Sequence, residues 1–382
     1  MMRMLLAAGG TGGHLRPAIS TAHALVRLEP SVKLLFLTAG RPVAERFLDG
    51  EPFAREALFP GRPSAPKRRD LFAWWGAYRR ACALIREFDP DVVVGFGGYP
   101  TAVAGAASLA GATGPLGVLW RLMTGHSLRP LILLEQNAKP GLAVRVLARC
   151  ARFVLLSMRL PREELPDRTS VVVTGNPLPR EFERPDKVEV DPRDFGLEPG
   201  RPILVVLGGS QGARGVNRMV LAARRRLAEA HPELQILLIT GDGDFAEVQE
   251  ALRHDPAPRT VAVPFETRML EAYTLADVVV ARAGGTTLAE LAVVGRPMVL
   301  VPYPHHRDGH QFANAEVFER VGAARVVPEG PGAADRLADE IGRWLQDGAS
   351  RREAGDCARR LGFPDAAERC AELILNSCER AE

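Results

Sequence analysis

Short apolar runs alternate with helical patterns along most of the chain. Met2–Ala8, Asp91–Gly95 and Ile203–Leu207 are mostly apolar, as expected for strands buried on both faces of a sheet. A helical pattern follows the first of them, from about Arg16 to Arg27. This alternation predicts an α/β fold built on parallel sheets. The other predicted strands are Lys33–Thr38, Leu131–Leu134, Arg152–Leu156, Val171–Thr174, Gln235–Thr240, Thr260–Val263, Asp277–Ala281, Pro297–Pro302 and Ala324–Val327.

Glycine-rich turns follow two of these strands. Gly9–His14 (GGTGGH) follows the first strand, and Gly208–Arg214 (GGSQGAR) follows Ile203–Leu207. A strand, a glycine turn and a helix together form the phosphate-binding arrangement of doubly wound folds. Because the device occurs in both halves of the chain, we expect two doubly wound domains.

A third strand–turn–helix unit begins after Asp277–Ala281. Its turn is Gly284-Gly285, and we expect Thr286 or Thr287 to cap the following helix. The first amides of that helix would then offer a phosphate site. Glu290 lies about one turn further on, where its carboxylate can accept hydrogen bonds from a ribose diol.

The loop after Pro297–Pro302 is polar and suits a polyhydroxy group. A metal-dependent hydrolase is the rival interpretation, because several of its residues are common metal ligands. No separate carboxylate–histidine motif completes such a site, and a hydrolase would leave the glycine turns unexplained. The residues concerned are His305, His306, Asp308, His310 and Gln311.

Domain boundaries follow from length and composition. A chain of 382 residues suits two domains, and Arg184–Gly200 is rich in Pro, Asp, Glu and Arg. We therefore expect domains over 1–184 and 201–363, with a linker over 185–200. Pro364 interrupts the C-terminal helical pattern, so a last helix over 365–380 can cross back onto the first domain.

Charge and cysteine content exclude several classes. A net charge of +3 is too small to argue for nucleic acid. Five cysteines without a CxxC pair indicate reduced thiols in a cytosolic protein. The apolar run near the start is too short for a signal peptide, and no run approaches the ~18 residues of a spanning helix. Any membrane contact is therefore expected to be peripheral.

The helix predicted over Asp70–Phe88 has two interpretations. Its apolar stripe, Leu71, Trp75, Tyr78, Cys82 and Ile85, fits a core helix with a solvated basic face. The same aromatic and basic mixture, Leu71–Tyr78, fits a surface resting on anionic lipid. The segment Thr113–Pro130 likewise either covers the core or adds a second membrane patch, Leu116–Met123.

Polar residues of the first half would face the second half across a cleft. These are His14, Tyr99, Glu135 and Asn137. Such a layout suits transfer of a sugar from a nucleotide to an acceptor, with His14 or Glu135 removing the proton of the acceptor hydroxyl. Helix dipoles and arginines would stabilise the departing diphosphate.

Seven motifs together resemble one family. GGTGGH, GFGGYP, EQN, TGNP, GGSQGARGVN, RAGGTTLAEL and HQFANA occur in the order and approximate spacing of the MurG family. The resemblance covers nearly the whole chain. It implies a GT-B fold, in which two doubly wound, Rossmann-like domains face a cleft.

The resemblance also implies an activity and its partners. The family is an inverting N-acetylglucosaminyltransferase that moves GlcNAc from UDP-GlcNAc to the muramyl 4-hydroxyl of lipid I. The products are UDP and lipid II, a precursor in peptidoglycan synthesis. The implied location is peripheral, on the cytoplasmic side of the cytoplasmic or inner membrane. No metal, no other cofactor and no nucleic acid are implied.

Site residues carry over from the matched motifs. His14 is implied as base or acceptor-positioning group, with Glu135 as the other catalytic candidate and Tyr99 on the acceptor side. Glu290 is implied to contact the ribose, and the backbone of Glu266 the uracil. The remaining implied donor-binding residues are Thr11, Gly12, Gly13, Asn137, Arg180, Ser210, Gly285, Thr286, Thr287, Leu288, Ala289, His310 and Gln311.

Three features depart from the family pattern. Pro179 stands where a donor-binding Arg often follows GNP, and Arg180 comes next. His310-Gln311 replaces a common Gln-Gln pair. Thr113–Pro130 is longer than usual before EQN, and no motif explains it.

Two other functions remain open. One is another activity on the same fold, such as a UDP-GlcNAc 2-epimerase or a transferase with a different acceptor lipid. The other is a non-catalytic protein that binds UDP-GlcNAc as a scaffold. The presence of His14, Asn137, Glu290 and Gln311 argues against the scaffold.

Overall fold

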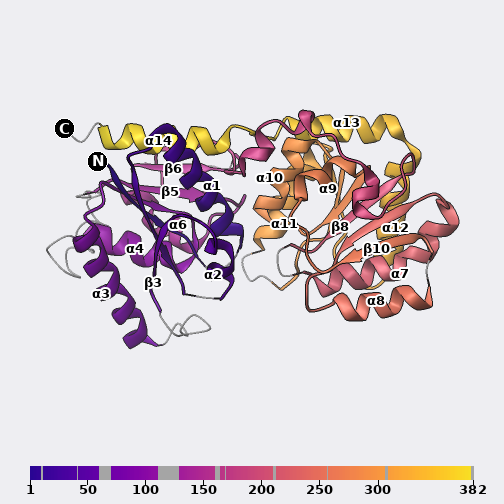
Figure 1. The fold of residues 1–382 in the computed structure, drawn as a ribbon, viewed down its shortest axis with the longest axis horizontal. Helices are drawn as coiled ribbons and strands as arrows, with labels where there is room; N and C mark the ends of the chain where they lie inside the picture. The colour runs from indigo at the N-terminus through magenta and orange to yellow at the C-terminus, as the bar shows by residue number, and fades with distance from the viewer. Residues whose placement is uncertain are drawn as a thin grey trace. The chain divides into compact units, whose positions relative to one another are not determined.

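The computed structural model describes residues 1–9, 12–40, 42–59, 70–110, 129–159, 164–167, 169–209, 212–255, 257–305 and 309–379. The chain divides into two compact units (Figure 1). Unit 1 comprises Met1–Arg180 and Asp365–Glu382, and unit 2 comprises Glu181–Pro364. Each unit has its own parallel sheet covered by helices, so the α/β fold predicted from the alternating pattern is confirmed.

Unit 1 contains a sheet that, among the described residues, has seven strands in the order β3-β2-β1-β4-β5-β6-β7. Every pairing in it is parallel. All residues of β4 and β5 are buried, which explains their unbroken apolar sequences. The strands are β1 Arg3–Ala7, β2 Lys33–Thr38, β3 Ala54–Ala57, β4 Val92–Gly95, β5 Leu131–Glu135, β6 Phe153–Leu156 and β7 Val171–Val173.

Side chains of β1 alternate between two cores, because successive residues of a strand point to opposite faces of the sheet. Met4 and Leu6 pack with α1 and α14. Leu5 and Ala7 pack with α3, α4 and α6. The helices of unit 1 are α1 Gly12–Leu28, α2 Pro42–Leu48, α3 Leu71–Phe88, α4 Gly98–Ala110, α6 Leu142–Leu147 and α14 Ala366–Glu379.

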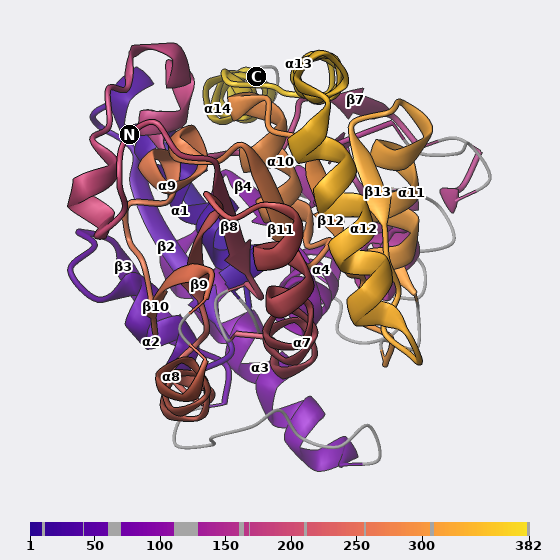
Figure 2. The ribbon, with the colours of Figure 1, turned by 90° about the vertical axis from the view of Figure 1, so that its right-hand side faces the viewer.

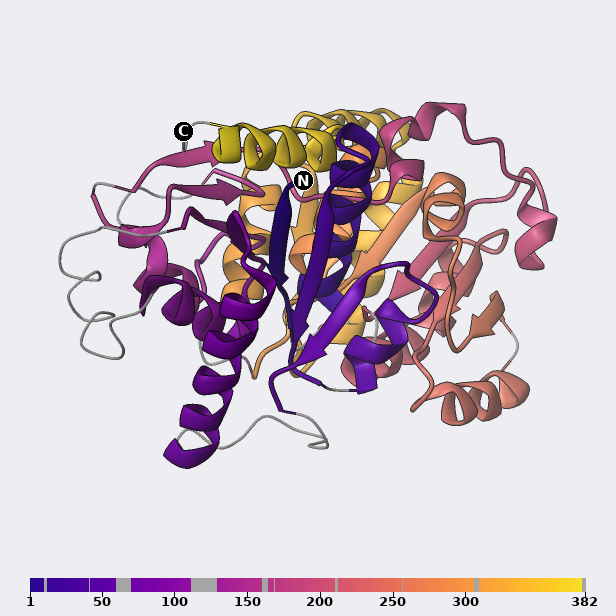
Figure 3. The ribbon, with the colours of Figure 1, turned by 60° about the vertical axis from the view of Figure 1, so that its left-hand side comes forward.

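The C-terminal helix α14 lies along α1 (yellow and indigo in Figures 1 and 3). Its buried residues Ala367, Cys370 and Ile374 belong to the core of unit 1. Arg152, just before β6, donates a hydrogen bond to the Ser377 carbonyl oxygen at 3.1 Å. Unit 1 is therefore built from both ends of the chain.

Unit 2 contains a parallel sheet whose described strands follow the order β10-β9-β8-β11-β12-β13. Helices α7 and α12 lie side by side on one face and share its core (Figure 2). The strands are β8 Ile203–Leu207, β9 Gln235–Ile239, β10 Arg259–Val263, β11 Val278–Ala281, β12 Met298–Leu300 and β13 Ala324–Val326. The helices are α7 Arg214–Ala230, α8 Phe245–His254, α9 Met269–Leu275, α10 Gly285–Val294, α11 His310–Arg320, α12 Ala333–Gln346 and α13 Gly348–Arg359.

The segment predicted as a linker contains short 3-10 turns. They are η5 Pro185–Lys187 and η6 Pro192–Phe195, and a further turn, η4 Arg180–Glu183, precedes the segment. Phe195 is buried, and the whole segment after Arg180 falls in unit 2.

Strand order reverses beside the first strand of each sheet. β1 lies between β2 and β4, and β8 lies between β9 and β11. At such points the following loops diverge and leave a crevice at the carboxyl ends of the strands, where open α/β sheets bind ligands. The loops after β1 and β4, and those after β8 and β11, are therefore the places to look for a site.

One described strand does not follow from the apolar pattern, namely β3. β3 (AREA) is a four-residue edge strand whose residues are exposed or half-buried, so it has no apolar run. Among the helices that the structure describes, none is long and apolar enough to span a bilayer.

Candidate active site

His14 lies in the first turn of α1, directly after the loop that leaves β1. Its Nδ1 is 2.8 Å from the carbonyl oxygen of Gly9. A carbonyl oxygen only accepts, so Nδ1 carries the proton and donates this bond. In the neutral ring the lone pair is then on Nε2, which is the nitrogen suited to remove a proton.

Gly97 allows the loop after β4 to approach His14 closely. A Cβ on Gly97 would lie 2.8 Å from Cδ2 and 2.9 Å from Nε2 of the imidazole. Its φ of +96° is also a conformation that side chains rarely adopt. The GFGGYP motif is thus explained by contact between the two loops at the strand-order reversal of unit 1.

Gln136 is a polar residue that the sequence analysis did not single out. Its side chain is buried, and its Nε2 donates to the Phe96 carbonyl oxygen at 2.9 Å, which fixes the orientation of the amide. Its Oε1 has no hydrogen-bond partner among the described residues. That oxygen lies 3.4 Å from the Cβ position over Gly97, on the side where Nε2 of His14 also lies. The EQN motif was the available signal.

The side chain of Glu135 accepts hydrogen bonds from residues of its own loop. Its Oε1 accepts from the backbone N and from Nδ2 of Asn137, at 3.0 and 3.1 Å, and its Oε2 accepts from the Gly141 N at 2.8 Å. The carboxylate is 3% exposed, and burial raises its pKa. These contacts favour a role in shaping the loop that carries Asn137 over a role as base.

Tyr99 lies in the first turn of α4 and packs against aromatic residues. Its ring centroid is 5.7 Å from that of Trp74 and 5.6 Å from that of Phe59. Gly12 and Gly13 begin α1, whereas Thr11 lies outside the described residues. The structure thus brings His14, Gln136 and the Gly97 loop together, with Tyr99 on the adjoining helix.

In unit 2, the helix α10 carries the predicted nucleotide-binding run from Gly285 to Glu290. Gly284 is its N-cap and makes no side-chain cap hydrogen bond. The prediction that Thr286 or Thr287 caps the helix is wrong, because both lie inside its first turn. Leu288 is buried and Ala289 half-buried. The first amides of α10 therefore follow a glycine N-cap, an arrangement that suits a phosphate.

Glu290 is buried in the second turn of α10. Its carboxyl Oε2 accepts a hydrogen bond of 2.9 Å from the hydroxyl group of Tyr273, a residue of α9. Tyr273 is itself completely buried. The sequence motif identified Glu290 but not the residue that holds it.

The loop after β8 requires glycine at two described positions. A Cβ on Gly208 would lie 2.3 Å from the Ala213 N, and one on Gly212 would lie 2.3 Å from the Thr240 carbonyl oxygen. Ala213, the N-cap of the following helix α7, makes no side-chain cap hydrogen bond. Ser210, the predicted phosphate contact, lies outside the described residues.

Arg282 organises the carboxyl edge of the sheet in unit 2. Its Nη1 donates to the carbonyl oxygens of Val301 and Pro302, at 3.0 and 3.3 Å. Its Nη2 forms an ion pair with Glu329, and its guanidinium lies 5.3 Å from the ring centroid of Tyr303. The buried arginine therefore fixes the backbone where the loop after β12 begins.

The far end of that loop is fixed as well. Gln311 Oε1 accepts from the backbone N of Tyr303 at 2.9 Å, and Asn314 Nδ2 donates to the Ala283 carbonyl oxygen at 3.0 Å. Both residues belong to α11, which begins at His310. Gln311 and His310 thus lie at the same sheet edge as α10.

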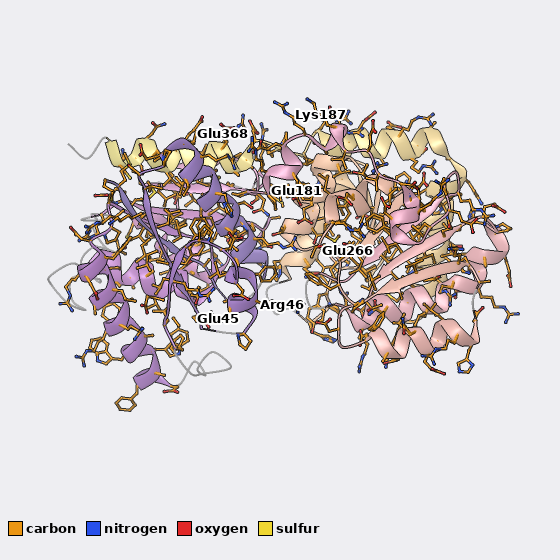
Figure 4. All side chains as sticks on the ribbon, viewed as in Figure 1. Glu45, Arg46, Glu181, Lys187, Glu266 and Glu368 are labelled. Carbon is orange, nitrogen blue, oxygen red and sulfur yellow. The ribbon has the colours of Figure 1, made fainter. Side chains whose placement is uncertain are left out.

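Two further predicted donor residues lie elsewhere in the chain. The Glu266 side chain, labelled in Figure 4, accepts from the Arg268 N at 2.8 Å, which shapes the turn before α9. Arg180 is exposed at the start of η4.

Metal ligation has no described cluster to support it. Among the residues that the structure describes, no three His, Cys, Asp or Glu side chains gather as a metal site. His306 and Asp308 of the predicted polar loop lie outside that part of the chain.

Comparisons with known proteins agree with this architecture. Residues 4–156 match the glycosyltransferase family 28 N-terminal domain, and residues 203–370 match the family 28 C-terminal domain. The structure of MurG from Acinetobacter baumannii matches with a TM-score of 0.75 at 24% identity, over 98% of this chain and 99% of that one. A UDP-GlcNAc 2-epimerase from Neisseria meningitidis, bound to UDP-GlcNAc, matches with a TM-score of 0.68 at 12% identity, over 98% and 100%. These likenesses establish the GT-B fold.

Sequence relatives establish the family. The UDP-N-acetylglucosamine–N-acetylmuramyl-(pentapeptide) pyrophosphoryl-undecaprenol N-acetylglucosamine transferase of Syntrophotalea carbinolica is 34% identical over 99% of both chains. The enzyme of that name from Coxiella burnetii is 34% identical over 100% of this chain and 99% of its own. The chain belongs to the MurG family of N-acetylglucosaminyltransferases, within glycosyltransferase family 28.

Proposed function

We propose that this protein transfers GlcNAc from UDP-GlcNAc to the 4-hydroxyl of the muramyl sugar of lipid I. The products are lipid II and UDP, and the pathway is peptidoglycan synthesis. Full-length identity to transferases of that name supports the assignment. The observation that carries the chemistry is the hydrogen bond from His14 Nδ1 to Gly9, which puts the lone pair of the neutral ring on Nε2.

The bond changes balance without a covalent enzyme intermediate. The acceptor oxygen attacks the anomeric carbon of GlcNAc while the bond from that carbon to the UDP oxygen breaks. The configuration at the anomeric carbon inverts, and the acceptor proton passes to Nε2 of His14. UDP leaves with the bonding electron pair, and amides at helix N-termini stabilise the negative charge that develops on the diphosphate.

Most donor contacts are assigned to unit 2, and Gly12, Gly13 and Asn137 of unit 1 stay predicted donor contacts. The N-termini of α7 and α10 suit the diphosphate, and Glu290 suits the ribose. The turn at Glu266 suits the uracil, and His310 with Gln311 suits the hydroxyls of GlcNAc. UDP-GlcNAc is a substrate here, and the proposed chemistry calls on no metal or other cofactor.

Acceptor binding and proton removal are assigned to unit 1. Oε1 of Gln136 and Nε2 of His14 both lie near the Cβ position of Gly97. Oε1 of Gln136 therefore accepts a hydrogen bond from the lipid-linked sugar, next to the hydroxyl group whose proton passes to His14. Glu135 holds the loop that presents Asn137. Tyr99 adjoins this region from α4.

A lipid acceptor requires contact with a membrane surface. The first two turns of α3 expose Leu71, Phe72 and Trp75, at 72%, 92% and 48%. Of the predicted stripe, Ile85 is buried together with Ala77 and Ala81, so the core interpretation holds for the second half of α3 and not for Leu71 and Trp75. Arg79 is exposed on the same helix, which suits an anionic surface, whereas the exposed Arg80 pairs with Glu56 at 2.7 Å. The other predicted patch, Leu116–Met123, lies outside the described residues.

Activity is tested by UDP release from UDP-GlcNAc, with and without a lipid I analogue. Acceptor-dependent release that is lost in His14→Ala and Glu290→Ala supports the transferase. Epimerisation of the sugar without acceptor would identify an epimerase instead. Binding of UDP-GlcNAc with no turnover under any acceptor would identify the scaffold.

A further inference from the structure

Tyr273 connects two helices of unit 2 at one buried hydrogen bond. Its phenol is 2.9 Å from Oε2 of Glu290, and both side chains are buried, at 0% and 3% exposure. A phenol keeps its proton at neutral pH, so it donates and the carboxylate accepts. Hydrogen bonds to an ionised acceptor are about twice as strong as those between neutral groups.

The helix that carries Tyr273 is held at both ends. Before α9, the Arg268 guanidinium lies 4.2 Å from the ring centroid of Phe195, and the Arg268 N donates to Glu266. At the other end, Arg296 Nη2 donates to the Thr274 carbonyl oxygen. Tyr273 therefore stands on a fixed element and imposes its own position on Glu290.

Fixing this carboxylate has a direct consequence for ligand recognition. A glutamate side chain has several rotatable bonds, and ordering a long side chain costs up to roughly 2 kcal/mol. The bond to Tyr273 selects one orientation before a ligand arrives. An ionised carboxylate has about four lone-pair sites, so this bond is compatible with further donors such as a ribose diol.

Helix α9 also directly follows the turn that is assigned to the uracil. The turn Phe265–Arg268 precedes α9 directly, and Tyr273 lies within α9. Helix α9 would thus contribute to recognition of both parts of the nucleoside. The turn before it would contact the uracil, and Tyr273 would act on the ribose through Glu290.

We propose that Tyr273 is a positioning residue that holds Glu290 for the ribose cis-diol and so makes this site prefer ribonucleotides to deoxyribonucleotides. The inference rests on the proposed function in one respect, namely that Glu290 contacts the ribose of the donor. It concerns binding of the nucleoside diphosphate and not the transfer step.

The test compares affinities of the full-length protein for UDP and for 2′,3′-dideoxy-UDP by calorimetry. Wild type is expected to bind UDP more tightly. Tyr273→Phe keeps the ring and removes the donor, so UDP affinity should fall about tenfold while that for 2′,3′-dideoxy-UDP changes less than about twofold. Added to Glu290→Gln, the Tyr273→Phe change should cause little further loss, because the two residues act as one unit.

A matched control removes another buried phenol hydroxyl. Tyr78→Phe does so in α3 of unit 1 and should leave both affinities unchanged. The dideoxy ligand reports whether Tyr273→Phe keeps the fold, since its affinity depends on the site but not on the diol.

Two results would overturn the inference. Equal losses for both ligands in Tyr273→Phe would mean that the residue only supports the fold. A wild type that does not distinguish the two ligands would mean that Glu290 does not read the ribose. Failure of the proposed function would look different, because ribose discrimination would persist without acceptor-dependent UDP release.

Discussion

The imidazole of His14 lies directly over the Cα of Gly97, so close that a methyl group on Gly97 would come within 2.9 Å of Nε2. The two residues belong to loops after β1 and β4, which are neighbours in the sheet. The imidazole of the proposed base therefore packs against the backbone of Gly97, and its Nδ1 donates a hydrogen bond to the Gly9 carbonyl oxygen.

Gly97→Ala should displace the imidazole and reduce transfer by about 100-fold, because small misplacements of a catalytic group cost that much. The rate is measured as acceptor-dependent UDP release. Gly50→Ala is the matched control, since Gly50 has a similar φ of +82° but nothing within 4 Å of its Cβ position. Comparable losses in the two variants would attribute the effect to backbone strain alone.

Glu135→Gln should destabilise unit 1 by about 2 kcal/mol, because one amide oxygen cannot replace two carboxylate oxygens that accept three bonds. Denaturant unfolding measures the loss. If Glu135 were the base, the variant would instead lose transfer with its stability intact.

The pH dependence of stability should change in the same variant. Burial raises the pKa of Glu135, so the folded state binds this proton more tightly than the unfolded chain does. Its contribution is present at low pH and is lost as the pH rises through the folded pKa. Unfolding free energy measured against pH should show this decline in wild type and not in Glu135→Gln. A decline of equal size in both proteins would contradict the assignment.

Arg282→Met should release the loop after β12 and leave Glu329 without its partner. We expect a loss of about 2 kcal/mol in unfolding free energy and a higher KM for UDP-GlcNAc. Arg325→Met is the control, because Arg325 also lies over an aromatic ring, that of Trp344, but is more than half exposed. An unchanged KM in Arg282→Met would show that the loop does not depend on this contact.

Replacing Leu71 and Phe72 by Glu should abolish binding to anionic vesicles at low salt, as measured by sedimentation. These side chains are largely exposed in the structure, so the fold should be unaffected. Activity on a water-soluble acceptor analogue should also persist. Val171→Glu serves as control, since Val171 is a half-exposed apolar residue on β7. If the α3 variant sediments with the vesicles as wild type does, this surface is not the one that binds the membrane.

Much of the fold could be predicted because buried parallel strands have unbroken apolar sequences. β4 and β8 follow this rule, whereas the exposed edge strand β3 does not. Periodicity placed α3 correctly but not its exposed face, because a helical stripe does not reveal which neighbour covers it. Leu71 and Trp75 fit the stripe but are 72% and 48% exposed.

The site shows the same division. Glycine motifs mark where backbone must approach backbone, and they led to His14 and Glu290 from sequence. Gln136 and Tyr273 were missed because their roles depend on contacts made only in the folded chain. Tyr273 lies 17 residues before Glu290 and on a different helix. The Arg282–Glu329 ion pair joins residues still further apart in sequence.

The most direct test of the account measures acceptor-dependent UDP release by wild type and His14→Ala, together with the affinity of each for UDP. We expect release to fall by 10²- to 10⁴-fold in His14→Ala, the usual contribution of a general base. UDP affinity should change little, because His14 is assigned to the acceptor proton and most donor contacts are assigned to unit 2. Release at a rate near that of wild type, with the acceptor present, would contradict the assignment of His14 as the base.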